Sequence, residues 1–246
     1  MAKEFEVRFD GLLPAQPDEA WAAITTPQTA GWLWAIDYEP RVGGAERGLS
    51  GDGGKVTAWE PNRHFATRAQ RSDGWFNELD YLLEPRAGGT FLRYVHRGVM
   101  DDAGFDNDYE ACRRHTAFYY HSLGEYLGHF AGRPAVYVSA DAPPESAASG
   151  SFAAVRRELG IGGGAAAGDR MTVDLPGAAG VEATIDYLTP EFIGLRTDDA
   201  LYRFYGRDAF GWPVGVAHHL FGEDAVGSDA ERAWGDWLAG LYRARV

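Results

Sequence analysis

The sequence predicts an α+β fold: an antiparallel sheet followed by one long helix, and then a smaller α+β unit of strands with a C-terminal helix. Three observations carry this prediction. Between residues 35 and 99, strand-like segments alternate with turn residues, as in an antiparallel meander. Residues 107–132, NDYEACRRHTAFYYHSLGEYLGHFAG, place apolar side chains at helical spacing. After residue 168, a second series of strand-like segments again ends in a helix.

Composition restricts the class of protein. The chain has 246 residues, of which 45% are hydrophobic, so it can bury a sizeable core. Its net charge of −13 repels polyanions, which disfavours a nucleic-acid role and binding to an anionic membrane surface. A single cysteine can form neither an internal disulfide nor a CxxC metal site.

No segment is expected to cross a membrane or to direct export. No apolar run approaches the roughly 18 residues of a membrane span. The N-terminus, MAKEFEVRFDG, goes straight into strand-like sequence without a signal-peptide apolar region. We therefore expect a cytoplasmic protein with no membrane insertion, whose partner is a small molecule or another protein rather than a nucleic acid.

The first unit is expected to open with a strand and two short helices. In EFEVRFDG, Phe5, Val7 and Phe9 share one face at period two. Pro17 marks the start of a first helix and Pro27 the start of a second. The expected order is therefore strand, two short helices, several strands and one long helix.

The long helix is predicted to be amphipathic. At about 100° per residue, one stripe faces inward; it comprises Cys112, Thr116, Tyr119, Leu123, Tyr126, Leu127 and Phe130. His115 lies at the border of this stripe, and Cys112 is interpreted as an inert small hydrophobe. His121 and His129 lie about 12 Å apart along the helix axis. That separation is too large for one ion, so we predict no metal site here.

Five words of sequence, in this order, resemble a known family. They are DEAWAAIT (18–25), EPRVGG (39–44), GKVTAWEPNRHF (54–65), YLLEPRAGGTFLRYVHRGV (81–99) and RHTAFYYHSLGEYL (114–127). On these words, residues 5–130 resemble the START-like helix-grip superfamily called SRPBCC, in the branch of activators of the ninety-kilodalton heat-shock chaperone's ATPase. The chain has Phe118-Tyr119 where that family often has Gly-Trp. The resemblance implies a curved antiparallel sheet that grips the long helix, with a cavity between them that accepts hydrophobic ligands.

Strand alternation nominates residues that would line such a cavity. TFLRYVHRGV places Leu92, Tyr94 and His96 on one face, and NELDYLLE places Leu79 and Tyr81 together. A mostly apolar wall with a few polar groups is typical of a small-molecule pocket. The predicted ligand-binding residues are Trp32, Trp34, Leu79, Tyr81, Leu92, Tyr94, His96, His115, Tyr119 and Leu123. The alternative is a filled core, in which the buried histidines are satisfied structural residues.

The chain is predicted to contain two domains and a linker. Residues 1–132 form the helix-grip domain, 133–168 a linker rich in Pro, Ala, Gly and Ser with a short helix, and 169–246 a smaller START-like half-domain. TIDYLTPEFIGLRT parallels VTAWEPNRHFATRA, so the last part is interpreted as a degenerate second copy without the two short helices. His218 and His219 point to opposite faces of a strand, so one is expected in the core and the other exposed.

Three functions from different classes remain open. The preferred one is binding of a small hydrophobic ligand, such as a lipid or a polyketide, in the grip cavity. The second is a co-chaperone-like, protein-binding adaptor that activates a chaperone ATPase. The third is a polyketide cyclase or aromatase, with His96, His115 and Tyr119 as acid or base groups. The chain has no GxSxG, HExxH or Walker motif, so we assign no catalytic residue and expect no cofactor.

Overall fold

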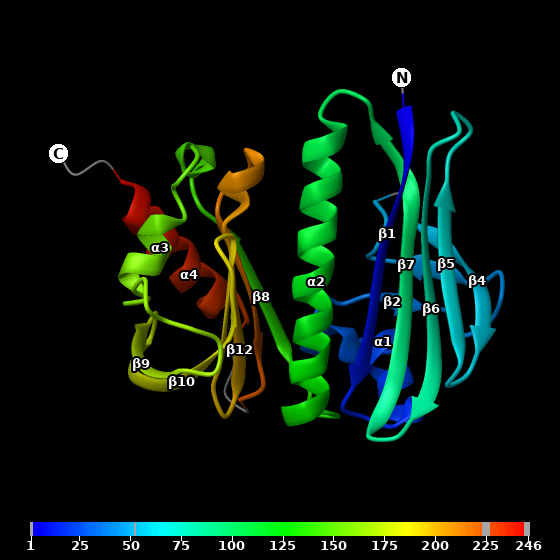
Figure 1. The fold of residues 1–246 in the computed structure, drawn as a ribbon, viewed down its shortest axis with the longest axis horizontal. Helices are drawn as coiled ribbons and strands as arrows, with labels where there is room; N and C mark the ends of the chain where they lie inside the picture. The colour runs from blue at the N-terminus through cyan, green and yellow to red at the C-terminus, as the bar shows by residue number, and fades with distance from the viewer. Residues whose placement is uncertain (1, 52, 223–226, 244–246) are drawn as a thin grey trace. The chain divides into compact units, whose positions relative to one another are not determined.

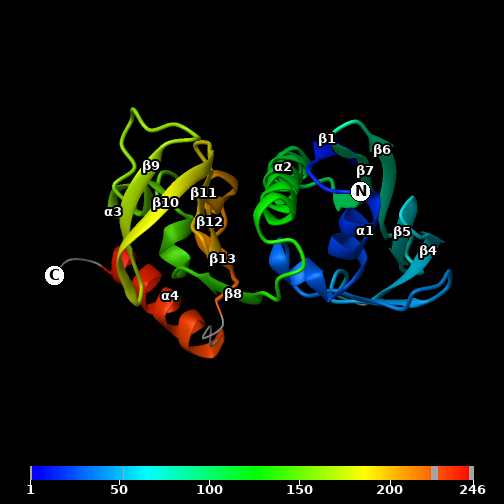
Figure 2. The same ribbon diagram turned by 90° about the horizontal axis from the view of Figure 1, so that it is seen from below.

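The computed structural model describes residues 2–51, 53–222 and 227–243, which divide into two compact units. The first unit spans Met1–Pro134 and the second Ala135–Val246. Each combines one antiparallel sheet with helices, as the predicted α+β class requires (Figures 1 and 2). Within the described residues, no helix is both long enough and apolar enough to cross a membrane.

The first unit is a curved seven-stranded sheet with helices on its inner side (Figure 2). Its elements are β1 (Ala2–Leu13), α1 (Pro17–Thr25), η1 (Pro27–Gly31), β2 (Asp37–Tyr38), β3 (Ala45–Arg47), β4 (Gly54–Glu60), β5 (His64–Gln70), β6 (Phe76–Arg86), β7 (Gly89–Asp101) and α2 (Phe105–His129). The strand order is β1-β7-β6-β5-β4-β3-β2, so the first strand lies beside the last. The helix-grip fold predicted from the resemblance is confirmed.

The edge strand β1 shows why the sheet has two chemically different faces. It pairs with β7 along its whole length, from Ala2 opposite Asp101 to Leu13 opposite Thr90. Because side chains alternate across a strand, the apolar residues of β1 turn inward and its charged residues outward. The inner face therefore packs against the helices, while the outer face carries ionisable side chains.

The two short helices lie where they were predicted, and local contacts stabilise their ends. Glu19 Oε2 accepts a hydrogen bond from the backbone N–H of Gln16 at 3.0 Å, and Pro17 occupies the first turn of α1. Trp32 follows η1 and is 2% exposed. Its Nε1 donates to the carbonyl of Ala23 at 2.9 Å, which ties the end of η1 to α1.

The long helix α2 buries more than the predicted stripe. Five predicted residues are buried: Thr116, Leu123, Tyr126, Leu127 and Phe130. Cys112 and Tyr119 are half-buried instead. Tyr120, which the stripe omitted, is 4% exposed and stacks on Phe9 of β1 with ring centroids 4.8 Å apart. The face that meets the sheet is therefore broader than a single line of residues.

The second unit is a six-stranded sheet with a C-terminal helix. Its elements are β8 (Val136–Asp141), η2 (Pro144–Ala147), α3 (Ala153–Glu158), β9 (Arg170–Leu175), β10 (Ala178–Leu188), β11 (Phe192–Arg196), β12 (Ala200–Tyr205), η3 (Arg207–Phe210), β13 (Gly215–Leu220) and α4 (Gly227–Tyr242). The strand order is β8-β13-β12-β11-β10-β9. Trp234 and Leu238 of α4 are buried in its core together with Val138 of β8.

The segment 133–168 was predicted to be a linker, but from Ala135 onward it belongs to this second unit. Its strand β8 pairs with β13 over six positions, from Val136 opposite Leu220 to Asp141 opposite Gly215. Val155 of α3 is fully buried in the same core. The Pro and Ala content of the segment led to the prediction of a linker, although it contains the short strand VYVSAD with the buried residue Val138.

The two units share one topology, which corrects the prediction of a half-domain beginning at residue 169. In each, the first strand pairs with the last, short helices follow the first strand, antiparallel strands come next and a helix follows the last strand; in the second unit η3 lies between the last two strands. The pair η2 and α3 occupies the place of α1 and η1, so the two short helices do have a counterpart. Among the described residues, the second unit has one strand fewer than the first and begins at β8.

Candidate functional site

The interior of the first unit gathers most of the predicted ligand-binding residues. Leu79 lies opposite His96, and Tyr81 opposite Tyr94, on neighbouring strands β6 and β7. Leu79, Tyr81 and Tyr94 are between 4% and 6% exposed. Two further predicted residues, Leu92 and Leu123, are also buried there. The period-two alternation therefore identified the inner face of the sheet correctly.

Aromatic rings pack against one another across this interior. Tyr120 of α2 is at the centre, with its ring centroid 4.5 Å from that of Tyr94, 5.8 Å from Trp32 and 6.4 Å from Tyr81. Phe65 of β5 extends the cluster, 5.6 Å from Tyr81. Sequence reasoning missed Tyr120 because it lies just outside the predicted stripe of α2.

The tyrosine hydroxyls form a buried polar centre inside this apolar shell. The hydroxyl of Tyr120 hydrogen-bonds with those of Tyr81 and Tyr94. Burial raises the pKa of Tyr81 to about 12, and it raises the pKa values of Tyr94 and Tyr120 well above their ordinary value. All three therefore stay protonated at neutral pH and can donate hydrogen bonds.

A second polar group, a chain of three side chains, links the sheet to α2. Asn77 Oδ1 on β6 lies 2.6 Å from His96 Nε2 on β7, and His96 Nδ1 lies 3.4 Å from Cys112 Sγ on α2. The Asn77 oxygen can only accept, so Nε2 carries the imidazole proton and Nδ1 presents a lone pair to the thiol. Sequence reasoning considered His96 and Cys112 separately and did not identify Asn77.

Burial keeps both titratable groups of this chain neutral. It lowers the pKa of His96 from 6.5 to about 4 and raises the pKa of the Cys112 thiol to about 11. A hydrogen bond with Thr116 opposes part of the shift at Cys112. Tyr94 lies close enough that charge on Cys112 would raise the pKa of Tyr94, after the larger effects of burial and Tyr81. The buried tyrosine hydroxyls and the chain Asn77–His96–Cys112 are therefore neighbours.

Glu46 of β3 brings a carboxyl group to the same inner face. Its side chain is 2% exposed, and its Oε1 accepts hydrogen bonds from the backbone N–H groups of Leu49 at 2.8 Å and Ser50 at 3.2 Å. Its Oε2 is buried and has no hydrogen-bond partner among the described residues. Glu46 lies opposite Tyr38, whose pKa is raised well above its ordinary value by burial and then by Tyr81 and Glu46.

Three predicted residues lie toward the edge of the interior rather than at its centre. Trp34, His115 and Tyr119 are all half-buried. The Tyr119 ring lies 5.9 Å from Trp34 and 6.0 Å from His115. Trp34 Nε1 donates to the carbonyl of Gly48 at 2.7 Å, and His115 Nδ1 lies 2.7 Å from the carbonyl of Ala111. His115 and His96 thus occupy different parts of the unit, on α2 and on β7.

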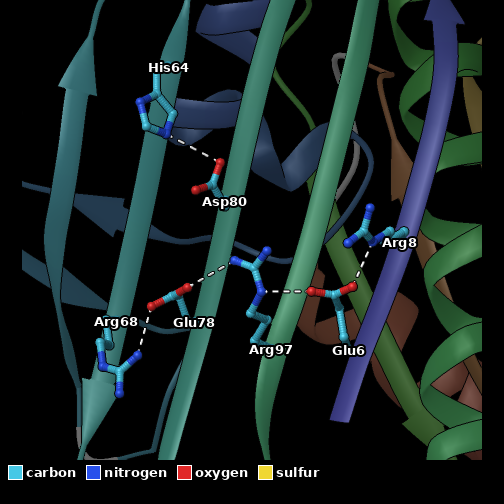
Figure 3. A network of polar contacts seen from close by, with 7 residues as sticks. All are labelled: Glu6, Arg8, His64, Arg68, Glu78, Asp80 and Arg97. Carbon is cyan, nitrogen blue, oxygen red and sulfur yellow. Dashed lines mark hydrogen bonds and ion pairs between the residues drawn. The ribbon is translucent and has the colours of Figure 1, made fainter.

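The outer face of the same sheet carries a network of ion pairs (Figure 3). Arg97 of β7 is central, with its Nε 2.8 Å from Glu6 of β1 and its Nη1 3.3 Å from Glu78 of β6. Glu6 also contacts Arg8, and Glu78 also contacts Arg68. His64 and Asp80 form a separate pair at 3.2 Å. These side chains are between 24% and 66% exposed, so the network lies at the surface.

The second unit contributes a surface hollow and two buried histidines. The hollow has a volume of about 610 Å³ and lies beside α3, with Phe152, Arg156 and Asp208 in its lining. His218 and His219 are 0% and 1% exposed, which corrects the expectation that one would be exposed. His218 lies among aromatic rings, 4.1 Å from Trp234, and burial lowers its pKa well below the ordinary value. His219 packs beside Tyr137 of β8 at 5.6 Å.

Metal ligation has no geometric basis in the part of the chain that is described. Among residues 2–51, 53–222 and 227–243, no three His, Cys, Asp or Glu side chains lie close enough together to hold an ion. The polar groups of the first unit can instead donate and accept hydrogen bonds to an uncharged molecule. That chemistry suits binding, orientation and proton transfer.

Comparison with known proteins finds a family model that matches part of the first unit. Residues 14–128, slightly under half of the chain, match the family model described as activator of Hsp90 ATPase homolog 1-like protein. No curated protein matches the chain.

Several solved structures are similar at low identity. Protein MLL2253 from Mesorhizobium loti is 21% identical, with a TM-score of 0.44, over 51% of this chain and 98% of that one. The Aha1 protein from Colwellia psychrerythraea, solved as a dimer, is 22% identical, with a TM-score of 0.40, over 50% and 96%. DynU16, from the dynemicin biosynthetic locus, is 18% identical, with a TM-score of 0.43, and covers 96% of both chains.

Proposed function

We propose that the first unit, whose residues 14–128 form a domain of the activator of Hsp90 ATPase homolog 1-like family, binds a small, largely aromatic molecule that carries a hydrogen-bond donor. The observation that carries this proposal is Glu46 Oε2, a buried carboxyl oxygen without a hydrogen-bond partner among the described residues. A buried polar atom left unpaired costs about 1–3 kcal/mol. A ligand hydroxyl or amine that donates to Oε2 would remove this cost.

The surroundings of Glu46 favour an aromatic ligand. Tyr38, directly opposite, packs its ring 4.7 Å from Phe65, and Phe65 contacts Tyr81. Aromatic rings associate through edge and offset contacts, so the ring of a ligand can pack against these side chains as the protein's own rings do. Tyr81, Tyr94 and Tyr120 supply hydroxyl groups that can donate to a ligand carbonyl. The ten predicted ligand-binding residues thus remain the proposed wall, with Glu46 and Tyr120 added.

A pair of ligands that differ in one hydroxyl group tests this proposal. We would titrate the protein calorimetrically with 4-(4-hydroxyphenyl)butan-2-one and with 4-phenylbutan-2-one, which lacks the phenol. The phenol is expected to bind at least fivefold more tightly, because only it can donate to Glu46. In Glu46→Gln this preference is expected to disappear, since an amide at this position presents a donor as well as an acceptor.

The matched control is Glu60→Gln, a change at a glutamate whose side chain is 52% exposed. This variant is expected to retain the preference for the phenol. The absence of heat with both compounds would contradict binding of this ligand class. An unchanged preference in Glu46→Gln would instead place the ligand elsewhere and reject the role of Glu46.

A second candidate function is favoured by the family description alone. Its name specifies activation of the Hsp90 ATPase, so we propose chaperone binding as the alternative. Addition of this protein to a purified Hsp90 chaperone would then raise the rate of ATP hydrolysis in proportion to the complex formed. An unchanged rate at saturating concentration would reject this alternative.

A further inference from the structure

The chain Asn77–His96–Cys112 has the arrangement of a nucleophile, a base and a residue that orients the base. The three side chains come from β6, β7 and α2, so folding alone brings them together. Cys112 Sγ lies 3.4 Å from His96 Nδ1, and His96 Nε2 lies 2.6 Å from Asn77 Oδ1. In this geometry the lone pair of His96 Nδ1 faces the thiol, and the N–H of His96 Nε2 donates to the amide oxygen of Asn77.

We propose that Cys112 adds covalently to apolar α,β-unsaturated carbonyl compounds that enter the interior of the first unit, with His96 as the proton acceptor and Asn77 as the positioning residue. This inference rests on the proposed function, because the electrophile must enter the same interior as a reversible ligand. It assigns a covalent activity to the only cysteine in the sequence.

The addition balances without an oxidant or a leaving group. As Sγ forms a bond to the β-carbon, the thiol proton passes to His96 Nδ1. The π electrons of the carbon–carbon double bond move toward the carbonyl and give an enolate. His96 then returns the proton to the α-carbon, so the net reaction adds S–H across the double bond. Asn77 Oδ1 accepts from Nε2–H throughout and stabilises the transient imidazolium.

The interior of the first unit can stabilise the negative charge of the enolate, and it favours one class of electrophile. Tyr94, adjacent to Cys112, belongs to the group of buried tyrosine hydroxyls and can donate to the enolate oxygen. Cys112 and His96 are both half-buried, so a small molecule can reach them, but in surroundings that are mostly desolvated. Apolar, uncharged electrophiles are therefore favoured over ionic ones.

Base assistance predicts a distinctive dependence of the reaction rate on pH. Burial holds the thiol protonated, so a reaction through free thiolate would accelerate about tenfold per pH unit across the neutral range. With His96 as the acceptor, the rate depends on neutral imidazole and is flat from about pH 5.5 to pH 8, since the pKa of His96 is about 4.

The test uses 4-phenylbut-3-en-2-one as the electrophile and intact-protein mass spectrometry as the readout. The wild-type chain is expected to gain one adduct, and Cys112→Ser none. His96→Gln is expected to react at least tenfold more slowly and to regain the rise with pH. Asn77→Leu is expected to react severalfold more slowly. The reference thiol is Ala87→Cys in a Cys112→Ser background, an exposed cysteine whose rate should follow its own thiolate fraction.

The saturated analogue 4-phenylbutan-2-one separates the two proposals. Binding of this ketone without any adduct from the enone would overturn the covalent inference and leave the proposed function intact. Neither binding nor adduct would reject both. A wild-type rate that rises about tenfold per pH unit, as for an unassisted thiol, would overturn the role of His96 even if His96→Gln failed to fold.

Discussion

His96 Nε2 lies 2.6 Å from Asn77 Oδ1, and this hydrogen bond between neighbouring strands determines which imidazole nitrogen faces the long helix. Asn77 thereby directs the lone pair of His96 toward Cys112 rather than toward the sheet. The hydrogen bond crosses β6 and β7 diagonally on the inner face, because Asn77 lies two residues before Leu79, the residue directly opposite His96.

The first prediction concerns pH. The pKa of His96 is about 4 in the folded protein and 6.5 ordinarily, because burial penalises the charged ring. Between these values the unfolded chain binds the proton more readily, so stability is full above pH 6.5 and falls as the pH drops toward 4. The loss is about 3 kcal/mol.

Urea unfolding of the wild type and of His96→Gln at several pH values measures this effect. The difference between the two curves should change by about that amount between pH 7 and pH 4. A parallel pair of curves, or a His96 NMR titration centred near 6.5, would contradict the buried, neutral imidazole.

The second prediction concerns the tyrosine hydroxyls. Tyr120→Phe removes the group that hydrogen-bonds with both Tyr81 and Tyr94, so it should lower the free energy of unfolding by about 1–3 kcal/mol. Tyr109→Phe is the control, because Tyr109 makes one weaker bond, to the carbonyl of Glu6 at 3.3 Å. A urea midpoint for Tyr120→Phe no lower than that for Tyr109→Phe would contradict this prediction.

The third prediction concerns the second unit. Arg203 Nη1 lies 3.0 and 2.9 Å from the two carboxyl oxygens of Asp186, and the two side chains are 0% and 3% exposed. Asp186→Ala leaves a buried cation without this partner and should cost about 3–5 kcal/mol. The exposed pair Asp229–Arg232 provides the control, since Asp229→Ala should cost at most about 1 kcal/mol. Similar melting temperatures for the two variants would contradict the prediction.

The fourth prediction concerns the network on the outer face (Figure 3). Arg97→Gln removes two ion pairs, but the Arg97 side chain is 40% exposed, so water and salt screen both. We expect a loss of at most about 1 kcal/mol at low salt and less at 1 M NaCl. A loss several times larger, unchanged by salt, would show that this network holds the sheet together.

The fold could be predicted from the sequence where local pattern and tertiary contact agree. In β1 and β7, the period-two pattern of the sequence predicted that Phe5, Val7 and Tyr94 face inward, and these side chains are the ones buried in the structure. The segment 133–168 failed this test because its composition suggests a linker. Pairing with β13, more than 70 residues away in the chain, makes VYVSAD a strand.

The candidate site was predicted only in part, for a similar reason. Alternation places His96 on the inner face, but it cannot show that Asn77 and Cys112 meet the two sides of its ring, because β6, β7 and α2 meet only in the folded chain. The burial of Glu46 could not be predicted from the sequence, since a glutamate in the short polar segment AER is expected to be exposed. Its burial follows from the pairing of β3 with β2 and β4.

Native mass spectrometry of the freshly purified protein would show whether the interior of the first unit holds a small apolar molecule. We expect a mass above that of the bare chain and release of an aromatic or otherwise apolar compound into organic solvent. After extraction, 4-(4-hydroxyphenyl)butan-2-one added in excess is expected to raise the mass of the bare chain by the mass of one ketone molecule. A bare mass before and after addition of the ketone would contradict this expectation and leave the aromatic interior as a filled core.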